Sequence, residues 1–145
     1  GMIMIDLDNF KEINDTFGHL HGDEVLLRVG DMIRNNVRSS DVAARIGGDE
    51  FCVILPNAGE EGLATVGERI REDFHSWVTR SDYREILDIS IGPALEDFAH
   101  PNPSSLDDLL RKADRVMYSE KSAHKRMQKR KETGEKMESL VVQGC

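Results

Sequence analysis

Apolar residues in the first part of the chain follow the periods of one strand and two helices. The segment from Met2 to Leu7 carries apolar side chains on both faces, as a central strand of a covered sheet does. A short helix is predicted from Phe10 to Phe17, and it ends at Gly18. A second helix is predicted from about Asp23 to Val37, because apolar residues recur there at helical spacing: Val25, Val29, Ile33 and Val37.

The middle of the chain predicts a β-hairpin. Val42 to Ile46 is predicted as one strand, and Phe51 to Leu55 is an unbroken apolar run that stops at Pro56. Gly47 and Gly48 lie between these two segments, and glycine permits the positive φ angles that a tight hairpin turn needs. The hairpin therefore carries Asp49 and Glu50 at its tip.

The remaining pattern predicts a helix, a strand and a last helix. The helix after the hairpin has a buried stripe of Leu63, Val66, Ile70, Phe74 and Trp77. Leu87, Ile89 and Ile91 then alternate with Asp88, Ser90 and Gly92, which predicts a strand with one exposed face. Ser104 or Ser105 is expected to cap the last helix, with Asp107 and Asp108 in its first turn. Its inward side chains are expected to be Leu106, Leu109, Ala113 and Met117.

The order β-α-α-β-β-α-β-α is typical of an α+β domain, an antiparallel sheet with helices on one or both faces. A chain of 145 residues fits one domain. We assign residues 1–126 to this domain and residues 127–145 to a polar C-terminal tail. Six Lys or Arg residues between Lys121 and Lys131 favour a solvated helix end, and we expect the tail to be flexible.

Composition limits the classes of function. Hydrophobic residues make up 39% and charged residues 32% of the chain, and no apolar run approaches the length of a membrane helix. The formal net charge of −8 argues against a nucleic-acid-binding protein. Two cysteines, Cys52 and Cys145, make no disulfide framework, so we expect a reducing cytoplasmic compartment and no membrane contact by this domain.

Two pairs of acidic residues stand at predicted strand ends, Asp6 with Asp8 and Asp49 with Glu50. One such pair alone would be explained by a turn or a solvated hairpin tip. Two pairs beside two core strands favour a shared cation, because four converging carboxylates repel one another without one. Carboxylates that hold cations against a phosphate group are the basis of metal-assisted phosphoryl transfer.

Two other metal or nucleotide motifs are excluded. An EF-hand would need an oxygen ligand at Phe10, a glycine at Lys11 and a bidentate glutamate at Phe17. The chain also lacks the G-x-x-x-x-G-K-[ST] pattern of a P-loop. A transition-metal site at His19 and His21 would lack a third ligand motif.

The motifs together resemble the GGDEF family of diguanylate cyclases, which condense two GTP molecules into cyclic di-GMP and two pyrophosphates. The resemblance extends from Ile3 to about Arg126. It rests on an ordered set of segments: Asp6-Leu7-Asp8-Asn9-Phe10-Lys11-Glu12-Ile13-Asn14-Asp15, Phe17-Gly18-His19, Gly22-Asp23, Arg45-Ile46-Gly47-Gly48-Asp49-Glu50-Phe51, and Ala113-Asp114 through Tyr118 to Lys121. It implies a cyclase-like palm, a central antiparallel sheet wrapped by helices.

The resemblance implies a metal and catalytic centre. Asp6, the Leu7 carbonyl, Asp49 and Glu50 would bind Mg²⁺ (or Mn²⁺), two ions per GTP. Asp49 occupies the position assigned in the family as base or metal ligand, with Glu50 beside it in the catalytic pair. The Gly-Gly-Asp-Glu-Phe signature is intact in this chain.

The resemblance also implies contacts to the substrate. Phe10 and Lys11 lie where a strand meets a helix start, which suits a phosphate. Lys121 and Lys125 match two basic positions for the β- and γ-phosphates, although the second is arginine after glycine in the family and here is Lys125 after His124. Asn14 and Asp23 match guanine-reading positions, and His19 is a further substrate-side position. Without a ligand, Lys11 and Asn14 would be surface residues and Asp23 an N-cap.

A second ligand site is implied by Arg38-Ser39-Ser40-Asp41. In the family, R-x-x-D at this offset from the two glycines is the inhibitory site for cyclic di-GMP, and Arg69 matches a further arginine for the same ligand. The alternative for Arg38 is a favourable charge at a helix C-terminus, and for Asp41 a turn residue. We favour the ligand site for Arg38 and Asp41, and leave both interpretations open for Arg69.

The resemblance thus implies a diguanylate cyclase with product inhibition, active as a homodimer because one nucleotide site cannot close a two-nucleotide ring. The family's N-terminal helix, with its D-x-L-T-x-L-x-N-R stretch, is absent ahead of Met2. We therefore expect a truncated chain whose full-length form has an upstream region such as a sensor or a membrane anchor. The alternatives are a non-catalytic cyclic di-GMP receptor and a GTP-binding regulatory domain.

Overall fold

The computed structural model describes the backbone of residues 1–97 and 105–142, and side chains up to residue 130 and at Thr133. Its elements are β1 (Met2–Asp8), α1 (Phe10–Phe17), α2 (His19–Asn36), β2 (Val42–Arg45), β3 (Glu50–Ile54), α3 (Glu60–Val78), β4 (Asp88–Ala94) and α4 (Leu106–Val142). This is the predicted order of elements. Across the described residues, no helix combines the length and apolar content that crossing a membrane requires.

The strands form one antiparallel sheet in the order β2-β3-β1-β4. β1 is central and pairs with both β3 and β4, and all seven of its residues are buried. Because side chains alternate along a strand, Ile3, Ile5 and Leu7 share one face and Met2 and Met4 the other. The predicted α+β fold with an antiparallel sheet is confirmed.

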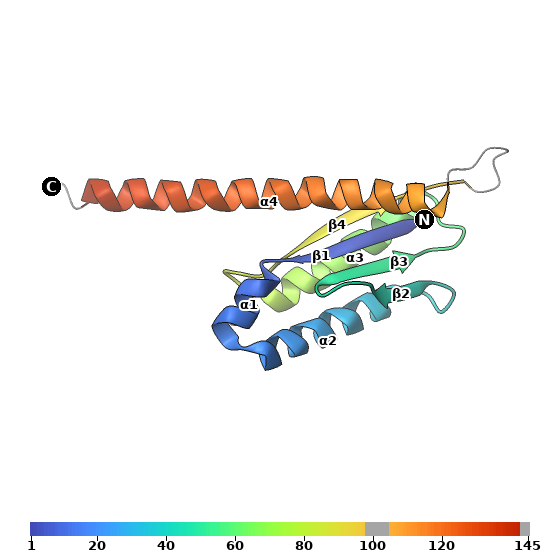
Figure 1. Cartoon of the computed structure of the whole chain (residues 1–145), viewed down its shortest axis with the longest axis horizontal. Coiled ribbons are helices and arrows are strands. Elements are labelled where there is room, and N and C mark those ends of the chain that lie inside the picture. The colour runs from blue at the N-terminus through green and yellow to red at the C-terminus, as the bar shows by residue number, and fades with distance from the viewer. Residues whose placement is uncertain (98–104, 143–145) are drawn as a thin grey trace.

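Helices cover both faces of the sheet (Figure 1). On one side the large core packs β1, β3 and β4 against α2 and α3, with Phe74 and Ile70 fully buried. On the other side α4 lies over β1 and β4, where Leu109, Ala113 and Met117 form a smaller core. Asp6 and Asp8 continue the second face beyond Met2 and Met4, so the sheet surface beneath α4 changes from apolar to acidic along β1.

β4 is not the half-exposed strand that its alternating sequence predicts. Ser90 and Gly92 are buried like Ile89 and Ile91, because α4 crosses the face that was expected to meet solvent. Gly92 makes this close approach possible, since a Cβ there would lie 2.2 Å from the Ala113 carbonyl oxygen.

Helix α4 differs from its prediction at both ends. Ser105 caps it, as one of the two predicted residues, with its Oγ accepting from the Asp108 N–H at 3.1 Å. Leu106 is 57% exposed rather than buried, while the other three predicted inward residues are buried. The helix continues to Val142, past the predicted domain end at residue 126. The flexibility of the tail 127–145 stays a prediction, and residues 143–145 lie outside the described part.

Helix α2 begins four residues before its predicted start. Gly18 adopts φ 92° and separates α1 from α2, and its carbonyl accepts from the Gly22 N–H at 3.3 Å. Asp23 therefore lies inside the second turn and is not an N-cap. The capping explanation for Asp23 is wrong.

Candidate functional site

The hairpin between β2 and β3 holds the acidic pair in place through its own backbone. The N–H groups of Ile46 and Gly47 donate to the carbonyl of Glu50 at 2.9 and 3.3 Å. Arg45 adds two hydrogen bonds, from Nε to the Gly47 carbonyl at 3.1 Å and from Nη2 to the Gly48 carbonyl at 2.9 Å. The loop that carries Asp49 is therefore fixed from both sides.

The two glycines of the hairpin act differently from the sequence prediction. Among the described residues, Gly18 is the glycine with positive φ, so Gly47 and Gly48 do not supply the expected positive φ angles. Gly47 is instead crowded by the side chain of Glu50, because a Cβ there would lie 2.4 Å from Oε2 of Glu50 and 3.2 Å from its Cβ. A Cβ at Gly48 would meet nothing within 4 Å. Gly47 thus leaves room for the Glu50 side chain to fold back over the turn.

The strand pairing brings the two acidic segments together. Asp6 of β1 is the cross-strand partner of Glu50 in β3, and the N–H of Leu7 donates to the Asp49 carbonyl at 3.1 Å. In an antiparallel strand the N–H and C=O of one residue point to the same side, so the Leu7 carbonyl points toward the hairpin as well. Asp6, the Leu7 carbonyl and the hairpin acids thus lie at one end of the sheet.

Asp6 is buried and carries an ion pair. It is 4% exposed, and its Oδ1 lies 2.5 Å from Nζ of Lys121 on α4. Burial raises the pKa of Asp6 and the charges of Asp49 and Asp8 raise it further, while Lys121 opposes the shift. Burial lowers the pKa of Lys121, but the carboxylates of Asp6, Asp8 and Asp49 outweigh this and raise it overall. These acids form a cluster that favours a cation, and the Lys121 ammonium lies against Asp6 in this structure.

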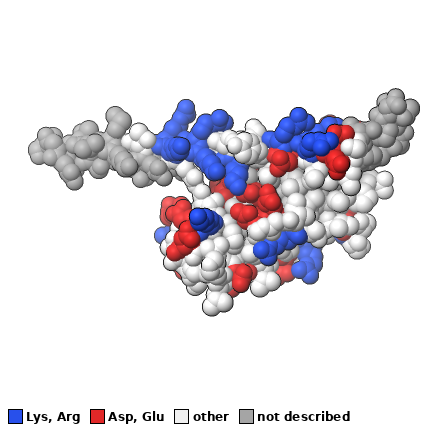
Figure 2. All heavy atoms as spheres, viewed as in Figure 1, with Lys and Arg blue, Asp and Glu red and all other residues white. Residues whose placement is uncertain are grey.

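Positive and negative side chains are also adjacent on the molecular surface around this site. Figure 2 shows Lys and Arg side chains gathered along α4 and a group of Asp and Glu side chains directly beneath the helix. Opposite charges on adjacent surfaces suit a ligand in which cations and phosphates are combined.

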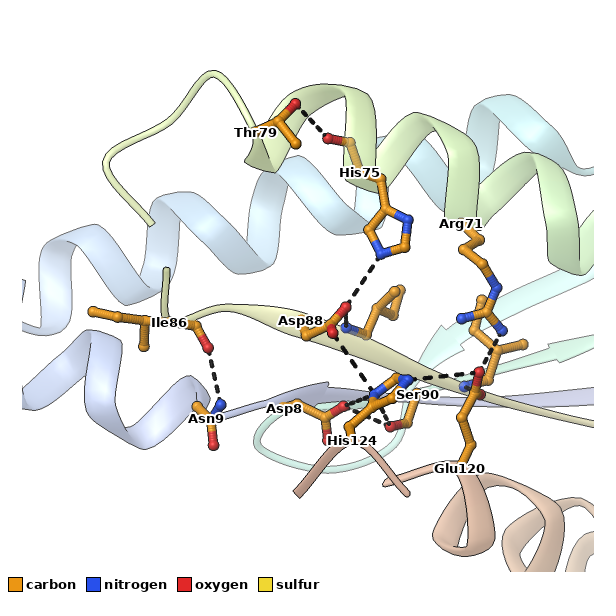
Figure 3. A network of polar contacts seen from close by, with 12 residues as sticks. Asp8, Asn9, Arg71, His75, Thr79, Ile86, Asp88, Ser90, Glu120 and His124 are labelled. Atoms are coloured by element: carbon orange, nitrogen blue, oxygen red, sulfur yellow. Dashed lines mark hydrogen bonds and ion pairs between the residues drawn. The ribbon is translucent and has the colours of Figure 1, made fainter. Parts of the chain in front are cut away.

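The expected convergence of four carboxylates is wrong for Asp8. Its Oδ2 accepts from Ser90 Oγ at 2.6 Å and lies 2.8 Å from Nδ1 of His124, so this oxygen already has partners on β4 and α4 (Figure 3). Within the described residues no three His, Cys, Asp or Glu side chains are arranged to hold a metal ion. The carboxylates of Asp6, Asp49 and Glu50 are near one another, and they would have to move closer together in order to bind one cation.

The start of α1 has no side-chain cap. Asn9 adopts φ 62° and its side chain donates to the Ile86 carbonyl at 2.9 Å, so it makes no side-chain cap of the helix. The N–H groups of Phe10 and Lys11 are therefore left without that cap. The side chains of Lys11 and Lys125 are both exposed.

Asn14 is placed by a close contact between two helices. A Cβ on Gly22 of α2 would lie 2.0 Å from Oδ1 of Asn14, so the Asn14 amide fits against the bare backbone of Gly22. Asp23, the next residue, is exposed. The two predicted guanine-reading residues therefore flank the same junction of α1 and α2.

The two histidines of this junction have different surroundings. His19 is exposed at the first position of α2. His21 Nδ1 lies 2.9 Å from the Tyr83 hydroxyl, and its ring is beside those of Phe17 and Tyr83. His21 thus belongs to an aromatic cluster, and His19 stays the predicted substrate-side residue.

Arg38 and Asp41 form a turn between α2 and β2. Oδ2 of Asp41 accepts from the Arg38 N–H at 2.8 Å, and the Asp41 N–H donates to the Arg38 carbonyl at 3.0 Å. Both residues line a cavity of about 650 Å³, together with Arg34. Arg69 is exposed on α3 and does not line this cavity.

Sequence reasoning missed the polar network beneath α4. Ser90 is fully buried. From α4, Nδ1 of His124 lies 3.4 Å from Ser90 Oγ, and Oε2 of Glu120 accepts from the N–H of Ile91, the next residue of β4 (Figure 3). The sequence feature that could have indicated this network is the histidine at position 124, where the resembled pattern has glycine.

Comparison with known proteins shows which family of domains this chain is similar to. A family model described as "Diguanylate cyclase, GGDEF domain" matches residues 1–127. The diguanylate cyclase DosC of Escherichia coli (strain K12) is 40% identical over 119 residues, which are 81% of this chain and 25% of the relative. Diguanylate cyclase A of Treponema denticola is 39% identical over 121 residues, 83% of this chain and 32% of the relative. The chain thus spans between a quarter and a third of the length of these two relatives.

A solved structure shares the fold. The GGDEF domain of DgcB from Caulobacter crescentus, in complex with c-di-GMP, aligns with a TM-score of 0.73 at 29% identity, covering 84% of this chain and 71% of that one.

Proposed function

Because the chain belongs to the GGDEF domain family of diguanylate cyclases, we propose that it condenses two molecules of GTP into cyclic di-GMP and two pyrophosphates. The observation that carries this proposal is the end of β1, where buried Asp6 lies beside the hairpin acids and in contact with the ammonium of Lys121. Such a site binds a cation and a polyphosphate together.

The metal ligands in this proposal are Asp6, the Leu7 carbonyl, Asp49 and Glu50. Bound Mg²⁺ or Mn²⁺, two ions per GTP, would neutralise phosphate charge and favour ionisation of the attacking hydroxyl. The residues present fit such ions, because the buried Asp6 carboxylate already pairs with a positive charge and its neighbours Asp49 and Asp8 add negative charge. In this proposal Asp49, in the loop held by Arg45, would receive the proton of the attacking hydroxyl.

The substrate contacts divide into a base end and a phosphate end. Asn14 and Asp23 would read guanine at the α1–α2 junction, since guanine offers N1–H and N2 donors to a carboxylate and an amide. His19 would contact the substrate nearby. At the other end, the N–H groups of Phe10 and Lys11 would bind phosphate oxygens. Lys121 and Lys125 would approach the β- and γ-phosphates from α4.

The reaction needs two copies of the domain. The 3′-oxygen of each ribose attacks the α-phosphorus of the other GTP, the bond to pyrophosphate breaks, and the hydroxyl proton leaves to the base. Each domain has one guanine-reading site, so two domains must face each other about a two-fold axis. The active species in this proposal is a homodimer.

The cavity beside Arg38 and Asp41 is proposed as the inhibitory site for cyclic di-GMP. Asp41 already holds the turn through the Arg38 N–H, which leaves the Arg38 guanidinium to pair with a phosphate or a guanine edge. Arg69 would have to contribute from α3, outside the lining of this cavity.

The test is synthesis of cyclic di-GMP by the chain fused to a dimerising coiled coil, incubated with GTP and Mg²⁺ and followed by mass spectrometry. Product should form, and Asp49→Asn should reduce its rate at least about a hundredfold. Asp31→Asn, an exposed acid on α2 paired with Arg34, is the matched charge control. If the dimer binds GTP but forms no product, the domain is a GTP-binding regulator. If it binds only cyclic di-GMP, it is a receptor.

A further inference from the structure

His124 lies among three carboxylates that come from three elements of the fold (Figure 3). Its Nδ1 is 2.8 Å from Oδ2 of Asp8 on β1 and 3.8 Å from Oδ2 of Asp88 on β4. Its Nε2 is 4.0 Å from Oε1 of Glu120, one turn earlier on α4. The imidazole is 22% exposed, so these contacts are largely withdrawn from water.

His124 supplies one of the polar contacts of the buried Asp8 carboxylate. Asp8 is 2% exposed, and its Oδ1 is buried with no hydrogen-bond partner among the described residues. Oδ2 has two neighbours that can donate, Ser90 Oγ at 2.6 Å and His124 Nδ1 at 2.8 Å. Because a buried carboxylate is costly without charge-assisted contacts, the His124 contact is a strong tie between α4 and β1.

The residues around His124 are held by α3 in turn. Arg71 Nη2 lies 2.8 Å from Oε1 of Glu120, whose Oε2 accepts from the Ile91 N–H at 2.5 Å. His75 Nε2 lies 3.2 Å from Oδ1 of Asp88. The network is therefore anchored on a helix that lies on the other side of the sheet from α4.

Two contacts connect α4 with the acidic end of β1. Lys121 contacts Asp6, and His124 contacts Asp8. The two basic residues are three apart on one face of α4, and the two acids are two apart on one face of β1. In the proposed reaction Lys121 must release Asp6 in order to reach a triphosphate. The His124 contact involves neither a phosphate nor a proposed metal ligand and can persist through that exchange.

We propose that His124 is a positioning residue that keeps α4 in register on β1 while Lys121 exchanges Asp6 for the substrate triphosphate. This inference rests on the proposed function. It assigns a role to the position at which the chain has histidine and the resembled pattern has glycine. His124 acts through Lys121 and does not touch the nucleotide.

The test compares binding of 3′-deoxy-GTP with that of 3′-deoxy-GMP by calorimetry in Mg²⁺, since neither ligand has the attacking hydroxyl. His124→Ala should lower the triphosphate-to-monophosphate affinity ratio about tenfold, which corresponds to about 1.4 kcal/mol. His124→Asn, which keeps a donor near the Nδ1 position, should restore most of it. Met127→Ala, an exposed side chain one turn further, is the control and should leave the ratio unchanged.

A double-mutant cycle separates positioning from general stability. In a Lys121→Met background, His124→Ala should cause no further fall in the ratio, because the residue through which it acts is gone. An unchanged ratio in His124→Ala, or an undiminished fall in the Lys121→Met background, would overturn the role of His124. If the unmodified chain binds neither nucleotide, the proposed function itself fails.

Discussion

Nζ of Lys121 lies 2.5 Å from Oδ1 of Asp6, a contact that joins residues 115 positions apart in the sequence. The contact places a positive charge against the buried carboxylate that the proposed metal centre needs. In the proposed metal site, the ammonium of Lys121 and a metal ion would therefore compete for Asp6.

Lys121→Met should separate the competition of Lys121 with a metal ion from its contact with the nucleotide. Without nucleotide, the affinity for Mn²⁺ should rise severalfold, because the competing ammonium is gone. The affinity for 3′-deoxy-GTP should fall about tenfold or more, as one charge-assisted contact is lost. Mn²⁺ affinity is measured by electron paramagnetic resonance and nucleotide affinity by calorimetry. Lys125→Met, which has no contact with Asp6, should weaken the nucleotide alone, and a fall in Mn²⁺ affinity for Lys121→Met would contradict the competition.

Gly47→Ala and Gly48→Ala test the space at the hairpin. The new Cβ at position 47 would lie 2.4 Å from Oε2 of Glu50, whereas position 48 is open. Gly47→Ala should displace Glu50, lower stability by about 1–3 kcal/mol and weaken Mn²⁺ binding. Gly48→Ala should change stability by less than about 1 kcal/mol in thermal unfolding. Equal behaviour of the two variants would show that Glu50 moves away freely.

Gly22→Ala tests how Asn14 is held. Its Cβ would take the position of the Asn14 amide, while alanine is otherwise favoured in a helix interior by about 1 kcal/mol. The unmodified chain should bind 3′-deoxy-GTP at least about tenfold more tightly than 3′-deoxy-ATP. Gly22→Ala and Asn14→Ala should both reduce this preference. Gly67→Ala in α3, where the nearest atom is 3.7 Å away, is the control. Equal GTP and ATP affinities in the unmodified chain would refute guanine reading.

Arg38→Ala tests the proposed inhibitory site. Cyclic di-GMP affinity should fall by ~1.5–3 kcal/mol through loss of charge-assisted hydrogen bonds. Calorimetric titration measures this directly and needs no cyclase activity. Arg34→Ala, which lines the same cavity but is 3.3 Å from Asp31, should have a smaller effect. Indistinguishable affinities for Arg38→Ala and the unmodified chain would return Arg38 to a helix-end charge.

The start of α4 should show a pH dependence through Asp108. Hydrogen bonds from Arg111 and Ser105 lower the pKa of Asp108 from its ordinary 3.8 to about 2. A lowered pKa in the folded state means that this contribution is present above pH 3.8 and is lost as the pH falls through about 2. Thermal unfolding between these limits should be less pH-dependent in Asp108→Asn. Asp107→Asn removes a charge from the same turn and should keep the dependence.

Much of the fold followed from local pattern. The apolar run of β1, the helical spacing in α2 and α3, and the glycines between two β runs predicted the order of elements, because periodicity records which faces are buried. The residue pattern located Asp6, Asp49 and Glu50 at predicted strand ends, and the family resemblance assigned them to a metal centre. Strand pairing then brought Asp6 opposite Glu50.

What the sequence left undetermined depends on elements that meet only after folding. Alternation in β4 predicted an exposed face, and α4 covers it because Gly92 admits the helix backbone. Asp8 was expected to converge with Asp6, Asp49 and Glu50 on a shared cation, and its Oδ2 instead contacts His124, 116 residues away. The sequence by itself determined which residues are acidic, apolar or small and in what period they recur. Only the tertiary structure decided which partner each buried carboxylate meets, because that choice depends on contacts between distant segments.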